Sequence, residues 1–294
     1  MSLRSYVSAA LLLAGAALGQ RSCNGSPELC GRKYSNVTFV GAHDSAFVGF
    51  LPVHNQYLPL DRQMALGVRF LQSQTRKKDG GIEMCHTSCI ELDAGSFADY
   101  VKPVKTFLDA NPNEVITMLV TNPESIAVEK YGDAFKAAGL DGYAFTPDSK
   151  LAMGDWPTLE QMIDSGKRLV VFMDYHSDTS KVPYILDEFA YYFETPWGWT
   201  DPAFAQCDLD RPDGASPDGR MYIVNHMLNV ELDILGFKIL IPDQEHAEQT
   251  NSVMSIIAQS DLCIAKYGRT PNVVLLDWVN RGDAMGSQRM LNNL

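Results

Sequence analysis

Short apolar runs alternate with amphipathic segments along most of the chain. The apolar runs are rich in Val, Ile, Leu and Phe and show little polar alternation, which is typical of parallel strands covered by helices. They predict strands over 37–42, 68–74, 82–86, 115–122, 168–175, 221–226 and 272–279, with 237–241 as an eighth candidate.

The segments between these runs carry apolar residues at helical spacing. They predict helices over 96–112, 125–139, 158–167, 182–193 and 251–268. Ser96 and Thr158 are expected N-caps, and Gln161 completes a capping box with Thr158. Gly139 is an expected C-cap, and Pro103 indicates a kink or a late start of its helix.

This alternation predicts a single α/β domain over residues 20–294. Its length of about 275 residues suits one (β/α) barrel of the TIM type, regular or distorted, since such barrels typically have about 250 residues. A doubly wound open sheet is the alternative, but no strand is followed by a Gly-rich phosphate fingerprint.

Residues 1–19 have the layout of a secretory signal peptide. Arg4 precedes an apolar run over 9–18, and the small residue Gly19 precedes the expected cleavage site. The run is about half the roughly 20 residues that a membrane span requires. We therefore expect a soluble protein that is secreted to the extracellular space.

Six cysteines in the expected mature chain suggest disulfides, because the secretory pathway is oxidising. Six cysteines allow 15 pairings. Proximity in the sequence favours Cys23–Cys30 and Cys85–Cys89, which leaves Cys207–Cys263. A zinc site built on Cys85, His86 and Cys89 is the alternative.

The formal net charge of −12 narrows the range of partners. An acidic surface is a poor match for nucleic acid and is repelled by anionic membranes at long range. A small anionic ligand in a locally basic site stays compatible with it. Asn24 and Asn36 lie in glycosylation motifs, as expected of a secreted glycoprotein.

Polar residues end most of the predicted strands. In a barrel, catalytic groups lie at the carboxyl ends of several strands. The strand ends provide His43–Asp44, Gln72 and Gln74, His86, Thr121–Asn122, Asp174, Asn225–His226 and Asp277. Two histidines with carboxylates available are what acid–base chemistry near neutral pH requires.

Four motifs also resemble a known family. "VGAHDSAF", "GVRFLQSQ", "CHTSC" and "NVVLLDWVN" occur in an order similar to that of the phosphatidylinositol-specific phospholipase C X-domain family, and most similar to secreted fungal phospholipase C-like phosphodiesterases. The resemblance covers about residues 37–283 and implies a catalytic barrel that cleaves a phosphodiester.

The resemblance also implies roles for individual residues. His43 matches the general base, oriented by Asp277, and His86 matches the general acid, with Asp44 as its carboxylate partner. The substrate's own inositol hydroxyl would attack phosphorus. Each proton transfer of this kind accelerates a reaction by about 10²–10⁴-fold.

The second motif departs from the family. Gln72 and Gln74 stand where the family has acidic calcium ligands or, in metal-free bacterial enzymes, an arginine. The expected calcium ligands are therefore absent, so no cofactor is assigned and calcium stays an open alternative. Arg76, Lys77 and Lys78 follow and could supply positive charge.

The sequence thus predicts a secreted phosphoric diester hydrolase acting on an inositol phospholipid or a related head group. Gln72, Gln74, Asn122, Asp174 and Asn225 are the expected substrate-binding residues. We expect a monomer with at most peripheral membrane contact and no nucleic-acid partner.

Two other functions stay open. One is a catalytically weakened or inactive barrel that binds a phosphorylated or polyol ligand. The other is a secreted glycoside hydrolase that uses Asp174 and Asp277, with Trp197 and Trp199 as sugar-stacking aromatics.

Overall fold

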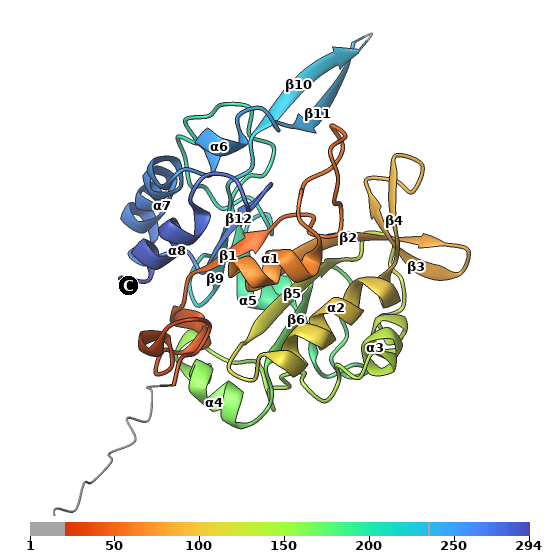
Figure 1. Cartoon of the computed structure of the whole chain (residues 1–294), viewed down its shortest axis with the longest axis vertical. Coiled ribbons are helices and arrows are strands. Elements are labelled where there is room, and N and C mark those ends of the chain that lie inside the picture. The colour runs from red at the N-terminus through yellow and green to blue at the C-terminus, as the bar shows by residue number, and fades with distance from the viewer. Residues whose placement is uncertain (1–20, 235) are drawn as a thin grey trace, which may run out of the picture.

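Eight parallel strands form the curled sheet at the centre of the molecule (Figure 1). The computed structural model describes residues 21–234 and 236–294, so the predicted leader lies outside the described residues. The eight strands are β1 (Phe39–Ala42), β2 (Phe70–Lys78), β5 (Ile116–Thr121), β6 (Leu169–Met173), β7 (Ile185–Asp187), β8 (Tyr192–Glu194), β9 (Met221–Asn225) and β12 (Val273–Leu276).

The order of these strands confirms the predicted TIM-type barrel. Hydrogen bonding runs β7-β6-β5-β2-β1-β12-β9-β8, so each strand lies beside its neighbours in chain order. In the described part of the chain no ladder joins β7 to β8, and the barrel is open along that seam. The barrel is therefore distorted.

Four further strands lie outside the barrel. β3 (Gly81–His86) and β4 (Leu92–Ser96) extend β2 as antiparallel strands, and β10 (Asn229–Ile234) and β11 (Phe237–Pro242) form a separate hairpin. The strands predicted over 82–86 and 237–241 therefore exist, but they are not parallel barrel strands. Each follows a connection too short for a parallel crossover, which needs a dozen or more residues.

Helices cover the outside of the barrel. They are α1 (Leu60–Leu66), α2 (Phe97–Ala110), α3 (Val128–Ala137), α4 (Leu159–Asp164), α5 (Glu188–Tyr191), α6 (Ala247–Thr250), α7 (Val253–Tyr267) and α8 (Ala284–Leu291), with 3₁₀ turns at Pro27–Leu29, Tyr34–Asn36 and Met153–Asp155. No helix among the described residues is long and apolar enough to cross a membrane.

Most of the predicted helix signals are confirmed. Ser96 caps α2 and Thr158 forms the capping box of α4 with Gln161. Pro103 lies inside α2, so this helix has no late start. Gly139, with φ of 70°, lies one residue beyond the C-cap of α3.

The predicted helix over 182–193 is wrong. This segment forms β7, the single turn of α5 and β8. Tyr192 packs into the barrel interior, whereas Phe193 on the opposite face stacks on Tyr222 with ring centroids 5.2 Å apart. Burial on two opposite faces suits a strand, and short apolar runs cannot be assigned by periodicity alone.

Side chains of alternate strand residues fill separate cores on the two faces of the sheet. One set, including Phe39, Phe70 and Leu275, fills the barrel interior, and the other, including Val40 and Val274, packs under the outer helices. At the amino ends of the strands, Tyr34 enters the interior and its hydroxyl lies 2.7 Å from Thr117 Oγ1. The Trp156 ring stacks on Tyr34 with centroids 4.7 Å apart.

Three disulfides link Cys23 to Cys30, Cys85 to Cys89, and Cys207 to Cys263, as proximity predicted. The zinc alternative is wrong, because Cys85 and Cys89 are bonded to each other.

Candidate active site

The interior face of the barrel becomes polar where the strands end. Because side chains alternate between faces, the interior positions after Phe39, Phe70 and Leu275 are held by His43, Gln72 and Asp277. The same alternation on the other strands leads to Asp174, Glu194 and Asn225. The carboxyl end of the barrel is therefore a ring of polar side chains.

His43 is oriented by Asp277 from the neighbouring strand. The imidazole Nδ1 lies 2.8 Å from Asp277 Oδ1, and Asn55 Nδ2 donates to the same oxygen at 2.9 Å. Since the ionised carboxylate only accepts, Nδ1 carries a proton and Nε2 is left to face the barrel mouth. The Asp277 side chain is buried, whereas the His43 side chain is 21% exposed.

His86 reaches the same place by a different route. β3 runs antiparallel to β2 and so returns the chain toward the barrel mouth, where it ends at His86. His86 Nε2 lies 3.4 Å from Asp44 Oδ2, and His43 Nε2 lies 3.4 Å from the same oxygen. The two imidazoles thus converge on one point. The Phe47 ring lies 5.2 Å from the His86 ring, centroid to centroid.

The two glutamines of β2 hold Asp44 in place. Gln74 Nε2 donates to Asp44 Oδ2 at 2.9 Å, and the Gln74 backbone N–H donates to Oδ1 at 3.2 Å. Gln72 Oε1 accepts from the Asp44 backbone N–H at 2.8 Å. Gln74 Oε1 in turn accepts from the Thr87 N–H at 3.2 Å, which ties Asp44 to the residue after His86.

The residues that follow His43, His86 and Asp277 have left-handed backbone geometry. Asp44, Thr87 and Trp278 have φ of 44°, 57° and 42°. Such conformations cost a non-glycine residue about 1–3 kcal/mol and persist only where surrounding contacts enforce them. They turn the chain sharply at the point where His43, His86 or Asp277 leaves its strand.

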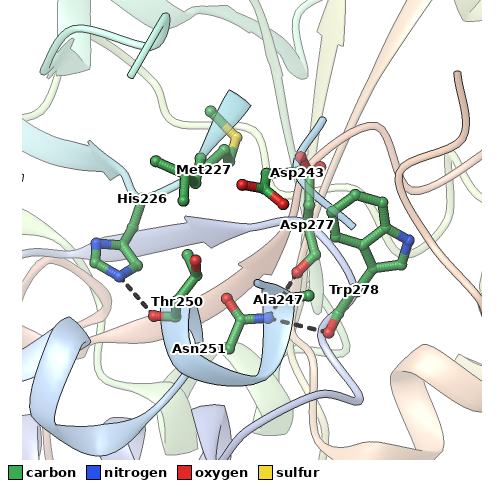
Figure 2. A pocket seen from close by; sticks show the side chains of 9 residues that line it. His226, Met227, Asp243, Ala247, Thr250, Asn251, Asp277 and Trp278 are labelled. Carbon is green, nitrogen blue, oxygen red and sulfur yellow. Dashed lines mark hydrogen bonds between the residues drawn. The ribbon is translucent and has the colours of Figure 1, made fainter. Parts of the chain in front are cut away.

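The turn after β12 is held by Asn251, from the segment between α6 and α7. Asn251 Nδ2 donates to the carbonyl oxygens of Asp277 and Trp278 at 2.7 and 3.0 Å (Figure 2). Figure 2 also shows the cavity that Asp277 lines together with Asp243 and His226. Its volume is about 10 Å³. A space of this size holds about one water molecule, so it is not a substrate site.

Two carboxylates set the charge of His43. Burial alone would lower the pKa of His43, but Asp44 and Asp277 outweigh it and raise this pKa to about 9. In the free protein His43 is therefore mostly an imidazolium at neutral pH.

A second buried cluster lies at the end of β8. Arg211 Nη2 and Asn225 Nδ2 donate to Glu194 Oε2 at 2.7 and 3.0 Å. Burial alone would raise the pKa of Glu194, but Arg211 holds it below its usual value. Burial and the adjacent Glu194 raise the pKa of Glu188 well above its usual value.

Sequence reasoning identified Asn225 in this cluster but missed Glu188, Glu194 and Arg211, and it also missed Asn55. Glu188 lies in the segment wrongly predicted as a helix, and Glu194 directly follows it. The wrong assignment meant that the end of β8 was not searched for site residues. Arg211 and Asn55 come from loops, where periodicity carries no signal. If residues 192–194 are assigned to a strand, the alternation that identified Asp277 also identifies Glu194 as a residue of the barrel mouth.

Asn122, Asp174 and Asn225 are committed to contacts within the protein. Asn122 Nδ2 and Oδ1 bond the backbone oxygen and nitrogen of Ile126, both at 2.9 Å. Asp174 Oδ1 accepts from the Asn122 and Tyr175 N–H groups, both at 2.7 Å, and burial raises the Asp174 pKa to about 6. Asp174 and Asp277 are separated by three intervening strands.

The β2 residues do not fit a calcium ion. Calcium needs six to eight oxygen ligands, but the side-chain oxygens of Gln72 and Gln74 already accept from Asp44 and Thr87. Among the described residues, no group of three His, Cys, Asp or Glu side chains could hold a metal ion.

Arg76 is the cationic residue nearest the site on the face of β2 that carries Gln72 and Gln74; Lys78, next on this face, donates to Asp93 Oδ2 at 2.6 Å. Arg76 follows Gln72 and Gln74 at alternate positions, and its Nε donates to the Thr87 carbonyl at 2.9 Å. Its guanidinium therefore lies against the residue that follows His86. Lys77 and Lys78 are exposed.

These features define a TIM-type barrel protein with a polar candidate site at the carboxyl ends of its strands. The family described as PI-PLC X 1 matches residues 29–292. The chain therefore belongs to the PI-PLC X family. Its membership in this family and its fold suggest a phosphodiesterase-type function.

Two fungal proteins of Arthroderma benhamiae are similar in sequence. "PI-PLC X domain-containing protein 1" is 53% identical over 92% of this chain and 90% of its own length. A second, named "Uncharacterized secreted protein", is 42% identical over 91% of this chain, which spans only 62% of that protein.

Solved bacterial structures share the fold. The phosphatidylinositol-specific phospholipase C of Listeria monocytogenes matches with a TM-score of 0.56 and 14% identity, over 90% of this chain and 95% of that one. A Staphylococcus aureus phosphatidylinositol-specific phospholipase C, from a structure titled for modulation of its membrane binding, matches with a TM-score of 0.56 and 16% identity, over 90% and 95%.

Proposed function

We propose that the protein is a secreted phosphoric diester hydrolase of the phospholipase C type that uses His43 and His86 as general base and general acid. One observation carries this proposal: both Nε2 atoms lie 3.4 Å from Asp44 Oδ2, while Asp277 holds His43 from behind. Two imidazoles that converge from different strands can act on the two sides of one phosphorus atom.

In this mechanism His43 Nε2 takes the proton of the attacking hydroxyl, whose oxygen forms the new bond to phosphorus. His86 Nε2 gives a proton to the oxygen of the leaving alcohol as its bond to phosphorus breaks. Asp277 stabilises the His43 imidazolium that forms. Asp44 lies between the two imidazoles, and its carboxyl group can pair with either ring when that ring is protonated.

We propose that Arg76 supplies part of the positive charge that a phosphodiester needs. The amides of Gln72 and Gln74 carry no charge and serve Asp44, whereas the Arg76 guanidinium lies against the residue after His86. A preorganised cation offsets the charge that builds on phosphoryl oxygens. This arrangement would work without a metal.

The substrate class follows from the family rather than from a bound ligand. Two structural neighbours are named as phosphatidylinositol-specific enzymes, which favours an inositol phospholipid or a related head group. We propose that the protein acts as a monomer and touches membranes only peripherally. Gln72, Gln74, Asn122, Asp174 and Asn225 then support substrate binding mainly by fixing the groups around it.

Three disulfides and a relative named as secreted support an extracellular location. We propose that residues 1–19 form the leader that directs this export. Of the two glycosylation motifs, the exposed Asn36 is better suited to carry a glycan, because the side chain of Asn24 bonds both backbone polar atoms of Val115.

The direct test is cleavage of phosphatidylinositol in detergent micelles, and of water-soluble glycerophosphodiesters, with calcium or with a chelator. We expect cleavage in both conditions and its loss in His43→Ala and His86→Ala. Activity that survives both substitutions would refute the assigned roles.

A barrel that binds without turnover is the second candidate. It is favoured by the uncharged Gln72 and Gln74 at positions where the family carries charge. Binding of inositol phosphate by the wild-type protein, with no cleavage of any diester tested, would support it over the hydrolase.

A further inference from the structure

The two imidazoles of the candidate site differ in how their second ring nitrogen is held. Nδ1 of His43 lies 2.8 Å from Asp277 Oδ1, so this ring has a carboxylate behind it. Nδ1 of His86 is buried and, among the described residues, has no hydrogen-bond partner. A buried polar atom without a partner costs free energy and calls for an explanation.

The proposed chemistry specifies which nitrogen atoms of His86 carry protons. If Nε2 gives its proton to the leaving oxygen, both ring nitrogens carry protons before that step. A neutral imidazole keeps one proton, so Nδ1 carries it afterwards. Nδ1 is therefore a donor throughout the reaction, and an acceptor beside it would hold the ring with Nε2 directed at the leaving group.

Glu91 provides a carboxylate close to this nitrogen. Its Oε1 lies 4.0 Å from His86 Nδ1, just beyond hydrogen-bond length, and its side chain is 39% exposed. In the part of the chain that the structure describes, the Glu91 carboxylate accepts no hydrogen bond, and only the Glu91 backbone N–H is engaged. The carboxylate can therefore turn toward Nδ1 without breaking another contact.

The backbone holds Glu91 and His86 side by side. β3 ends at His86, whose partner in the β3–β4 ladder is Leu92, the residue after Glu91. The Cys85–Cys89 disulfide closes the turn between the two strands. Closing the 4.0 Å gap therefore requires rotation of the Glu91 side chain, while the two backbone segments stay in place.

The other charged groups near His86 do not serve Nδ1. Asp44 Oδ2 lies 3.4 Å from His86 Nε2, on the side of the ring that faces His43. Arg76 has no acceptor to offer, and its Nε donates to the Thr87 carbonyl at 2.9 Å. Asp44 can therefore pair with Nε2 but leaves Nδ1 without a partner.

We propose that Glu91 is the positioning residue of the general acid: its carboxylate accepts from Nδ1 of protonated His86 and holds Nε2 toward the leaving oxygen. As the proton passes from Nε2 to that oxygen, the bond from the oxygen to phosphorus breaks, and the Nδ1 proton stays on the ring. Glu91 thus serves His86 as Asp277 serves His43. This inference rests on the proposed function, for which it names a further residue of the same site.

Two water-soluble diesters that differ in their leaving group isolate this role. Both carry inositol on the attacking side, and one releases glycerol whereas the other releases nitrophenol. Glycerol is a poor leaving group that needs a proton, whereas nitrophenolate leaves without one. A residue that acts through the general acid affects the first substrate, and a residue that only supports the fold affects both equally.

Glu91→Ala should lower kcat on the glycerol diester by about tenfold to a hundredfold, a part of the contribution of a general acid. KM should stay within about twofold, because Glu91 does not touch the substrate. On the nitrophenyl diester, kcat should stay within about twofold of the wild type. Glu91→Gln should lie between, since an amide oxygen still accepts but carries no charge.

Asp93→Asn is the matched control. Asp93 lies on the same β3–β4 hairpin, and its carboxylate accepts from Lys78 Nζ at 2.6 Å. The substitution also removes one negative charge from the hairpin, so it reports any general effect of charge. We expect the ratio of the rates on the two diesters to stay within about twofold of the wild-type ratio.

Proton NMR gives a readout that does not depend on turnover. The Nδ1 proton of protonated His86, identified by its loss in His86→Ala, should resonate far downfield, as in a charge-assisted hydrogen bond. This downfield shift should be lost in Glu91→Ala and kept in Asp93→Asn. A signal that is unchanged in Glu91→Ala overturns the contact, whatever the turnover.

The outcomes separate this inference from the proposed function. Equal losses on both diesters in Glu91→Ala, or no loss on either, overturn the role of Glu91 and leave the hydrolase intact. Wild-type protein that cleaves neither diester overturns the proposed function, and the NMR signal still decides whether Glu91 contacts His86. A loss confined to the glycerol diester, with the wild-type ratio kept in Asp93→Asn, supports the inference.

Discussion

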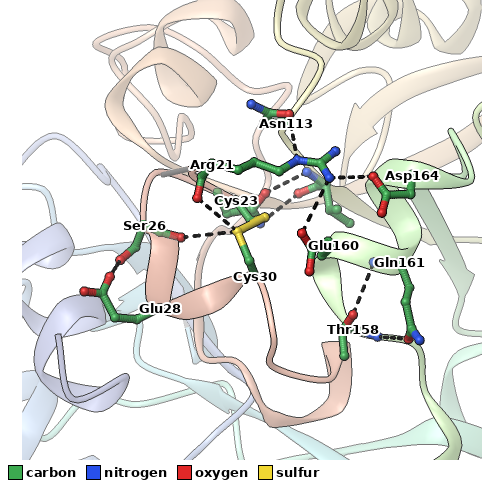
Figure 3. Close-up of a disulfide and its surroundings, with 12 residues drawn as sticks. Arg21, Cys23, Ser26, Glu28, Cys30, Asn113, Thr158, Glu160, Gln161 and Asp164 are labelled. Carbon is green, nitrogen blue, oxygen red and sulfur yellow. Dashed lines mark hydrogen bonds and ion pairs between the residues drawn. A yellow bond between two sulfur atoms is a disulfide. The ribbon is translucent and has the colours of Figure 1, made fainter. Parts of the chain in front are cut away.

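The two ends of the barrel differ in how their residues satisfy one another. At the amino end, Tyr34 and Trp156 stack in the interior, and the Cys23–Cys30 disulfide ties down the segment that carries Tyr34. Figure 3 shows Arg21 beside this disulfide reaching Asn113 and the acidic residues of α4. The contacts named here, an aromatic stack, a disulfide and two ion pairs, all stabilise the folded chain.

The carboxyl end contains features that cost folding free energy. His43, His86 and Asp277 are each followed by a residue with left-handed backbone geometry, and His43 and Asp44 place opposite charges in a largely buried position. Strain and buried charge are kept where a reaction needs preorganised groups. The comparison teaches that the amino end holds the barrel together, whereas the carboxyl end holds the strained and charged groups that the proposed reaction would use.

His43→Ala should have the largest effect on activity, and this effect should be confined to the site at the carboxyl end of the barrel. We expect turnover of a diester to fall by about 10²–10⁴-fold, the usual contribution of a general base. The melting temperature near pH 7 should fall only modestly, because Asp44 and Asp277 lose their cationic partner while the packing of the two cores is untouched. A large loss of stability would contradict this separation of the two ends.

Trp156→Ala should do the reverse at the amino end. Truncating a buried tryptophan costs about 3–5 kcal/mol of unfolding free energy. Urea denaturation measures this loss, and the turnover of the remaining folded protein should stay within about twofold of the wild type, since no group of the mouth is touched. An equal loss of turnover in the folded protein would mean that the ends are coupled.

The pH dependence should report on His43. Its pKa in the folded protein is about 9, so the neutral form that can accept a proton grows about tenfold per pH unit up to that value. For a diester with a nitrophenyl leaving group, which needs no proton from His86, kcat/KM should therefore rise between pH 7 and pH 9, and a maximum below about pH 7 would contradict the role of His43 as base.

Stability should move in the opposite direction over the same range. The folded-state pKa of His43 is raised above the unfolded value of 6.5, so its contribution is fully present below pH 6.5 and is lost as pH rises through about 9. His43→Ala should flatten this part of the stability profile measured by denaturation at each pH.

Asn55→Ala should have a smaller effect, because Asn55 acts through Asp277. Losing its donated hydrogen bond leaves Asp277 more strongly basic toward His43, which should raise the His43 pKa and shift the activity profile to higher pH. We expect about a tenfold loss of kcat/KM at pH 7. Asn113→Ala, which removes an amide contact of Arg21 at the amino end, is the control and should leave the profile unmoved.

The parts of this arrangement that the sequence predicted are those governed by periodicity. Alternation along β1 and β12 placed His43 and Asp277 on the interior face, and proximity paired the cysteines. β8 was missed because three residues are too few for a period to show. The site at its end, Glu194 with Arg211, was missed with it.

The roles of the two glutamines could not be read from periodicity. Gln72 and Gln74 were expected to face the substrate, and they do lie at the correct end of β2. Their hydrogen bonds go to Asp44 and Thr87, whose positions depend on loop turns with left-handed residues. Side-chain partners across loops follow from tertiary structure, which a single sequence does not specify.

The Cys85–Cys89 disulfide closes a loop around His86, one of the two converging imidazoles. Its place makes the position of His86 depend on an oxidising environment, because reduced cysteines would leave His86 without this tether. Diester cleavage that is unchanged in Cys85→Ser/Cys89→Ser would show that the tether is not needed.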